Sequence, residues 1–296
     1  MSATPLVSTI DSAARPSHQH RSLRRFVDRL LRFKMGLAAI LLLFALYCVA
    51  IFGPLLINTD PNQISFLEQL EGPSSDHWLG TDSVGRDVFA RLVHGGRISL
   101  FVSALAVLIS TTVGMTFGAL SGFHGGAIDS IIMRLTDATL AIPSFLLILV
   151  AVSVFGSSLA NLVIAIGLTS WMTVTRLVRG DFLRLRDTEF VEAARSVGAT
   201  NRRIILRHIL PEVISPVIVA SSTYVGSVVL LEAALSYLGL GIQPPDASWG
   251  NMLSNAQEYM WTRPMLAVYP GIALLVTVVA FNYSGEALRR ILSVRE

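Results

Sequence analysis

The chain has 296 residues, of which 52% are hydrophobic and only 15% are charged, and its net charge is +3. A soluble domain carries roughly 25% charged residues, so this composition excludes an ordinary soluble protein and indicates a lipid-facing surface. The single cysteine, Cys48, excludes an intramolecular disulfide and a cysteine-based metal site. The basic residues lie between apolar runs instead of on one segment with interleaved aromatic residues, which argues against nucleic-acid binding.

Six apolar stretches follow a polar tail at 1–34, and each is long enough, or nearly so, to cross about 30 Å of hydrocarbon. They are 35–57, 98–120, 138–155, 159–174, 213–240 and 265–281. The first begins too late and is too long for a signal peptide, so we expect an uncleaved helix. The pattern predicts an all-α polytopic membrane protein with about six transmembrane helices. We divide it into a tail at 1–34, a first helix at 35–57, an external loop at 58–97, a core at 98–288 and a tail at 289–296.

Lysine and arginine are distributed unevenly between the two sides of these predicted helices. The N-terminal tail holds seven and the segment between the fourth and fifth stretches holds eight; Arg134 and three C-terminal arginines bring that side to nineteen. The opposite side holds four, which are Arg86, Arg91, Arg97 and Arg263. Because cytoplasmic loops carry an excess of Lys and Arg, we predict that both termini and the segment between the fourth and fifth helices are cytoplasmic.

Small and charged residues within the apolar stretches indicate how the helices pack. Gly114, Gly118 and Gly122 recur every four positions, which lets another helix approach closely, and we expect helix packing there. Asp137 lies three residues after Arg134, and we expect these two side chains to form a pair near the membrane boundary.

Glu232 stands far inside the fifth stretch without a basic neighbour within a helical turn. Such a carboxyl group should face the bundle interior or a water-filled path. The first half of the same stretch is unusually polar and includes Tyr224 and Ser227. This helix is the candidate to line a translocation path through Glu232, Ser227 and Tyr224; interhelical hydrogen bonding is the alternative.

The segment 181–211 has the signals of a helix–turn–helix that projects from the bilayer. Thr188 is a predicted N-cap for a short helix at 189–197, and Gly198 suits a C-cap because glycine accepts positive φ. A second short helix should run from about residue 200 to Leu210, with Pro211 opening the next span. From these residues alone, an amphipathic interfacial loop remains the alternative.

The spacing of certain residues in this segment resembles the EAA loop of ABC importer permeases. The residues are Glu192, Ala193, Ala194, Gly198, Leu210 and Pro211, with His208 in place of the family's isoleucine. In that family the loop forms a coupling helix that docks in a groove of the ATP-binding subunit. Residues 77–100 and 235–253 are similar to segments of dipeptide/oligopeptide-type permeases of the C-subunit kind.

The resemblance implies a type I ABC importer transmembrane domain in a bacterial cytoplasmic (inner) membrane. The family's partners are a homologous second permease in a heterodimer, two ATP-binding subunits and an external solute-binding protein. The chain lacks a Walker A motif, so we expect no enzyme here, and ATP and Mg²⁺ should bind in the partner subunits.

The family transports several classes of cargo, and the residues of this chain leave them open. Di- and oligopeptides are the cargo that we expect; glutathione and nickel complexes are the alternatives within the family. A secondary transporter is a weaker alternative, because it should show inverted repeats and several intramembrane carboxylates. An intramembrane protease would need a base at membrane depth, yet every histidine lies in a predicted loop or tail.

Overall fold

The computed structural model describes residues 33–292, so most of the predicted tail at 1–34 and half of that at 289–296 lie outside the described residues. Within that range the chain is helical, and its β-structure is a single bridge between Thr81 and Asp87. The α-helices are α2 (Lys34–Leu56), α3 (Val88–His124), α4 (Gly126–Leu140), α5 (Ser144–Phe155), α6 (Leu159–Leu168), α7 (Trp171–Leu185), α8 (Glu189–Ser196), α9 (Asn201–Ile204), α10 (Leu210–Tyr237), α11 (Trp249–Ala256) and α12 (Met265–Leu292).

Five of the described helical segments are long and apolar enough to cross a membrane, and a sixth span results if the bent pair α4–α5 counts as one. These segments are α2, α3, α6 with α7, α9 with α10, and α12. The prediction of an all-α protein with about six transmembrane helices is therefore confirmed.

The helix α3 begins ten residues earlier than the predicted start of the second stretch at residue 98, and it extends over 37 residues. The side chain of Asp87 accepts a hydrogen bond from the backbone N–H of Ala90 and so caps the helix start. Residues 88–97 were predicted as the end of an external loop at 58–97, yet they are helical and Arg91 is only 2% exposed. Asp82 and the carbonyl of Pro61, described below, contact this buried guanidinium within a helix.

Two other predicted stretches are interrupted. The stretch 138–155 is split by a bend of 84° between α4 and α5, where Pro143 precedes the first residue of α5. Proline removes a backbone donor and disfavours helical geometry in the preceding residue, which explains the break. The stretch 159–174 is divided at Thr169 and Ser170, and its second half, α7, continues to Leu185.

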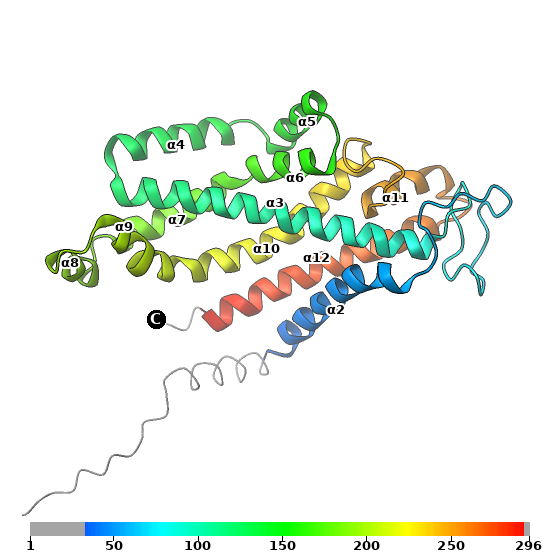
Figure 1. Ribbon diagram of the computed structural model, residues 1–296, viewed down its shortest axis with the longest axis horizontal. Helices are drawn as coiled ribbons and strands as arrows, with labels where there is room; N and C mark the ends of the chain where they lie inside the picture. Colours follow the sequence, from blue (N-terminus) through cyan, green and yellow to red (C-terminus); the bar gives the residue numbers. More distant parts are fainter. Residues whose placement is uncertain (1–32, 293–296) are drawn as a thin grey trace, which may run out of the picture.

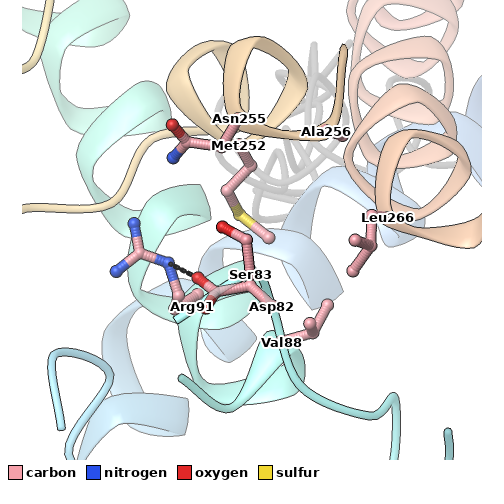
Figure 2. A pocket seen from close by; sticks show the side chains of 8 residues that line it. All are labelled: Asp82, Ser83, Val88, Arg91, Met252, Asn255, Ala256 and Leu266. Atoms are coloured by element: carbon pink, nitrogen blue, oxygen red, sulfur yellow. Dashed lines mark ion pairs between the residues drawn. The ribbon is translucent and has the colours of Figure 1, made fainter. Parts of the chain in front are cut away.

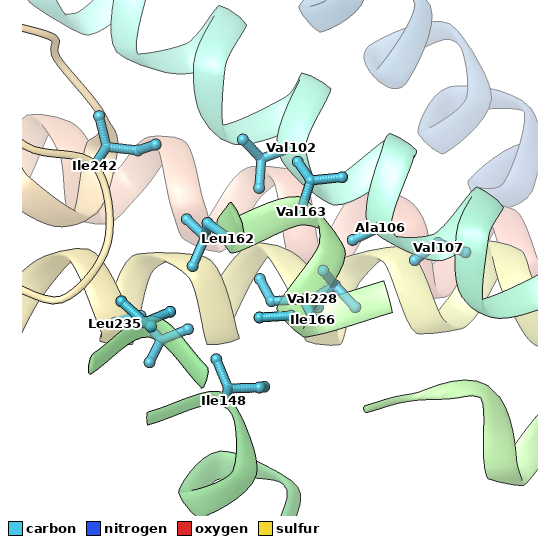
Figure 3. Packing of buried hydrophobic residues seen from close by; sticks show 12 residues of the cluster. Val102, Ala106, Val107, Ile148, Leu162, Val163, Ile166, Val228, Leu235 and Ile242 are labelled. Carbon is cyan, nitrogen blue, oxygen red and sulfur yellow. The ribbon is translucent and has the colours of Figure 1, made fainter. Parts of the chain in front are cut away.

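The long helices lie roughly side by side (Figure 1). The helices α3 and α10 run through the middle, with α2 and α12 on one side and α4 and α5 on the other. One apolar cluster joins α3, α5, α6 and α10 (Figure 3). The helices α8 and α9 lie at one end of the bundle, while α11 and the loop 57–87 lie at the opposite end. We call α11 and this loop the cap.

Candidate functional site

The short helix α8 presents one face to the bundle and the other to its surroundings. Val191 and Ala194 are buried, with exposed fractions of 0% and 8%. Glu192 and Ala193 are exposed, and Phe190 is 42% exposed on the same outer surface. The predicted motif residues therefore lie on two faces of α8. Glu192 and Ala193 are available for contact with another subunit, whereas Ala194 packs against the bundle.

The inner face of α8 rests on an apolar cluster, which we call the socket. It brings together side chains of α3, α7, α8, α9 and α10. Its buried members are Ala119, Phe123, Val174, Val178, Phe182, Leu185, Val191, Ala194, Ile204, Ile209, Val213 and Val217. Burial of such side chains is favourable in proportion to the area removed from water, so the socket fixes α8 to the ends of two spans.

A tight turn follows α8 at Gly198. Its φ is +82°, a region that glycine enters without steric cost. The N–H of Gly198 donates to the carbonyl of Arg195 at 2.9 Å, and that of Ala199 donates to Ala194 at 3.0 Å. Thr188 occupies the N-cap position, but its hydroxyl donates to the carbonyl of Leu185 at 2.5 Å. The predicted N-cap position of Thr188 is confirmed, although its side chain makes no capping hydrogen bond.

The second arm of the segment differs from the expected separate helix at about 200–210. The helix α9 is only one turn long, and a π-helical turn at Ile205–Ile209 joins it directly to α10. The backbone N–H of Leu210 bonds to the carbonyl of Ile205, five residues earlier. Leu210 and Pro211 therefore form the first turn of α10, and the segment continues into a span without a break.

The glycines at four-residue spacing lie against α7. A Cβ added at Gly114 would come within 2.6 Å of Val174 Cβ, and one at Gly118 within 2.6 Å of Val178 Cβ. At Gly122 the nearest atoms belong to Phe182 and Arg179. The absence of side chains at these three positions permits the close approach of α3 and α7.

Ion pairs attach α4 to α7. Asp137 pairs with Arg176 at 2.5 Å, so the expected pair with Arg134 is not formed. Arg176 reaches Asp137 across the interface from α7, an arrangement that the local i,i+3 spacing could not reveal. A second carboxylate, Asp129, accepts two hydrogen bonds from Arg179 at 2.6 and 2.7 Å.

The three candidate path residues on α10 do not share one environment. Glu232 is fully buried, with an exposed fraction of 0%, and accepts a hydrogen bond from Ser236. Tyr224 is partly buried against the cluster of α3, α5 and α6. Ser227 is exposed. Their spacing placed them on one helix, but the packing around α10 decides which of them face a neighbour.

A polar network in the cap is the feature that the sequence did not reveal. Arg91 Nε lies 3.7 Å from Asp82 Oδ2, and Arg91 Nη1 donates to the carbonyl of Pro61 at 3.1 Å. Figure 2 shows Arg91 and Asp82 beside Met252 and Asn255 of α11. The sequence analysis counted Arg91 only among the basic residues of the external side, and no local pattern indicates its partners.

Comparison with known families identifies the class. Residues 114–295 match the family described as "Binding-protein-dependent transport system inner membrane component", and residues 22–73 match the "N-terminal TM domain of oligopeptide transport permease C". The first match spans more than half of the chain. The chain therefore belongs to the inner membrane components of binding-protein-dependent transport systems, and it is a multi-pass permease subunit of an ABC importer.

Curated relatives extend this similarity over nearly the whole chain. The chain is 42% identical to the glutathione transport system permease protein GsiD of Pectobacterium atrosepticum, over 90% of this chain and 89% of the relative. It is 37% identical to the dipeptide transport system permease protein DppC of Alkalihalophilus pseudofirmus, over 97% and 95%. Among solved structures, the inward-facing MetNI methionine ABC transporter matches with a TM-score of 0.56 at 18% identity, over 69% of this chain and 97% of that one, which shows a shared fold.

Proposed function

We propose that this chain forms half of the membrane pore of an importer for short peptides. It pairs with a homologous second permease as a heterodimer, and two ATP-binding subunits bind ATP and Mg²⁺. An external solute-binding protein delivers the cargo. The chain catalyses no reaction itself; its spans move between inward and outward openings when the ATP-binding subunits close and reopen.

The arrangement of α8 carries this proposal. A helix with Glu192 and Ala193 exposed, and with Val191 and Ala194 seated in the socket, is suited to receive a partner subunit on its outer face. Because the socket joins α8 to α7 and α10, a displacement of α8 would displace these two helices as well. The motif residues that act here are Glu192, Ala193, Ala194, Gly198, Leu210 and Pro211. Of the three candidates for the path on α10, we keep Ser227 and Tyr224 and assign Glu232 another role below, because Glu232 is fully buried.

The peptide cargo is supported by the relatives. Two of the relatives belong to a glutathione transport system and a dipeptide transport system, and both of these cargoes are short peptides with free charges. A nickel complex is the alternative within this class of importer. Uptake of labelled glutathione and labelled alanylalanine, each competed with the other and with a nickel chelate, separates these cargoes.

Damage to the turn after α8 tests the coupling role. Gly198→Val places a β-branched residue at positive φ, at a cost of about 1–3 kcal/mol. A Cβ there meets no atom within 4 Å, so the effect is conformational. Gly180→Val is the matched control, because Gly180 has equal space on α7 without positive φ. Gly198→Val should reach the membrane yet fail to bind the ATP-binding subunits or to couple their hydrolysis to uptake.

Charge reversal at Glu192 is the second test of the same role. Glu192→Lys should weaken copurification of the ATP-binding subunits, whereas Glu258→Lys, exposed near the cap, should leave it unchanged. Full uptake and full stimulation of hydrolysis in both Gly198→Val and Glu192→Lys would show that 181–211 is only an interfacial loop. Uptake that continues without ATP, and stops when the ion gradient collapses, would instead identify a secondary transporter.

The proposed orientation places both termini and α8 in the cytoplasm and the cap outside. A cysteine at Ser75, on a Cys48→Ala background, should react with an impermeant reagent in intact cells, since Ser75 is exposed in the loop 57–87. Reaction only after the membrane is broken open would reverse the topology.

A further inference from the structure

The carboxyl group of Glu232 is fully buried near the cap end of α10. Its Oε1 accepts a hydrogen bond from Ser236 Oγ at 2.7 Å. Among residues 33–292 it has no ion-pair partner. Burial of a carboxyl group is costly unless hydrogen bonds compensate, so the bonds that a buried carboxyl group makes restrict the arrangement of the elements that it joins. The contacts of Glu232 therefore identify the elements that it holds.

The first element is the segment that leads from α10 to α11. The backbone N–H of Ile242 donates to Ser236 Oγ at 3.0 Å, so Ser236 links Glu232 to this segment. The N–H groups of Leu240 and Gly241 both donate to the carbonyl of Leu235, at 2.9 and 3.0 Å. The chain is thereby folded back onto the last turn of α10.

The other two elements are α3 and α11. Ser99 on α3 and Ser248 at the N-cap of α11 lie near the Glu232 carboxyl group, although its Oε2 makes no hydrogen bond in the described part of the chain. Ser99 Oγ also accepts from the backbone N–H of Trp249 at 3.3 Å. Ser99, Ser236 and Ser248 are all buried, so three elements converge on one carboxyl group.

Close backbone packing surrounds this convergence. A Cβ added at Gly95 of α3 would lie 3.2 Å from Ser248 Cα, and one at Gly250 of α11 would overlap the backbone of Ala233 on α10. The indole N–H of Trp249 donates to the carbonyl of Leu92 at 3.0 Å. The helix α11 is thus seated directly on α3 and α10.

Glu232 and the 181–211 segment lie toward opposite ends of the same helix. The 28 residues of α10 span about 42 Å at 1.5 Å per residue. Its first turn contains Leu210 and Pro211, and its last turns contain Glu232 and Ser236. On the outer side, α11 lies against the loop 57–87 around Asp82 and Met252 (Figure 2). Contacts therefore run without interruption from the cap to α8.

We propose that Glu232 is a positioning residue that fastens α11 to α3 and α10, so that movement of the cap is transmitted along α10 to the 181–211 segment. The partner that moves the cap is the loaded solute-binding protein, and in this respect the inference rests on the proposed function. Glu232 acts through α11 and does not contact the solute.

The test uses the complete transporter in lipid vesicles and two measurements. The first is hydrogen exchange of the backbone at residues 238–256. The second is the ratio of ATP hydrolysis with and without a binding protein, loaded with alanylalanine in one series and with glutathione in another. The variants are Glu232→Ala, Ser236→Ala and Glu232→Gln. Leu230→Ala is the control, since Leu230 is 48% exposed on the same helix.

Glu232→Ala and Ser236→Ala should raise exchange at Ile242 about tenfold, because the segment loses its attachment. The stimulated-to-basal ratio should fall about fivefold, the equivalent of one lost hydrogen bond, while basal hydrolysis stays constant. Glu232→Gln should recover most of both properties, since its amide oxygen still accepts the bond from Ser236. Leu230→Ala should match the unmodified protein.

Unchanged exchange at residues 238–256 in Glu232→Ala would overturn the fastening role. Raised exchange at residues 238–256 with a normal stimulated-to-basal ratio of ATP hydrolysis would show that movement of the cap is not transmitted through this attachment. If Glu232→Ala fails to assemble, Ser236→Ala carries the test, because it removes one hydroxyl and keeps the carboxyl group. If no binding protein stimulates even the unmodified complex, the proposed function fails, and the exchange measurement still tests the fastening.

Discussion

The two ends of α10 are held by different kinds of contact. At the α8 end, Val191 and Ala194 rest in an aliphatic and aromatic socket around Phe182. At the cap end, Glu232 and Arg91 are buried among hydroxyl, carboxyl and carbonyl groups. Apolar contact is non-directional and tolerates small shifts, whereas hydrogen bonds weaken steeply away from their preferred geometry. The cap is therefore held in one arrangement, while α8 can adjust to a partner and stay attached.

The largest expected effect concerns the buried cation of the cap. Arg91→Met leaves Asp82 with its nearer partner, Arg86 at 2.7 Å. However, it leaves buried acceptors such as the carbonyl of Pro61 unpaired, which should destabilise the protein by about 3 kcal/mol. Arg97→Met is the control, because Arg97 is exposed on the same helix and such surface changes cost roughly 0.5 kcal/mol or less. Thermal unfolding in detergent measures both. Equal midpoints for the two variants would show that the polar network does not hold the cap.

The socket at the other end should respond to a buried charge. Val191→Asp places a carboxyl group among apolar side chains and should cost about 2–3 kcal/mol. Detachment of α8 should then abolish copurification of the ATP-binding subunits. Val197→Asp is the control, since Val197 is 85% exposed just after α8. If Val191→Asp retains its partners, the socket is not what positions α8.

The close packing of α3 and α7 lies between these ends and should be less sensitive. A Cβ at Gly118 meets Val178 Cβ at 2.6 Å, so Gly118→Val should cost about 1–3 kcal/mol through overpacking. Thr116→Val, on the exposed face of α3, serves as control. The thermal midpoint should fall for Gly118→Val alone. Equal midpoints in the two variants would mean that the helices separate freely and that the two ends are not joined through this contact.

The features that the sequence predicted are those with local signals. Apolar length revealed the spans. The short helix α8 ends one residue before the predicted limit at 197, and the turn at Gly198 has the positive φ that its C-cap position suggested. These features depend on residues that are neighbours in the chain.

The features that the sequence did not predict depend on residues far apart in the chain. Ser99 and Ser248 meet at Glu232 although 149 positions separate them, and hydrophobic periodicity contains no information on such a meeting. Asp137 pairs with Arg176 of α7 instead of Arg134, and this pairing also depends on tertiary packing that local spacing does not indicate. Only the packed structure reveals these pairs.

The smallest expected effect is a pH dependence of the cap. His77 Nδ1 lies 2.8 Å from Asp87 Oδ2, and the other oxygen of Asp87 accepts from the N–H of Ala90 at the start of α3. The hydrogen bond to Asp87 raises the pKa of His77, and the carboxylate of Glu68, 3.8 Å from Nε2, raises it further. Protonated His77 therefore stabilises the folded cap.

Because the folded pKa of His77 is raised, its contribution is complete below the unfolded value of about 6.5 and is lost as pH rises through the folded value. The thermal midpoint of the unmodified protein should therefore fall more between pH about 6 and about 8.5 than that of His77→Gln. His124→Gln, exposed at the opposite end of α3, should behave like the unmodified protein. Identical pH profiles for His77→Gln and the unmodified protein would show that the loop 57–87 is held by its other contacts, and that the charge on His77 adds nothing to the rigidity that separates the cap from α8.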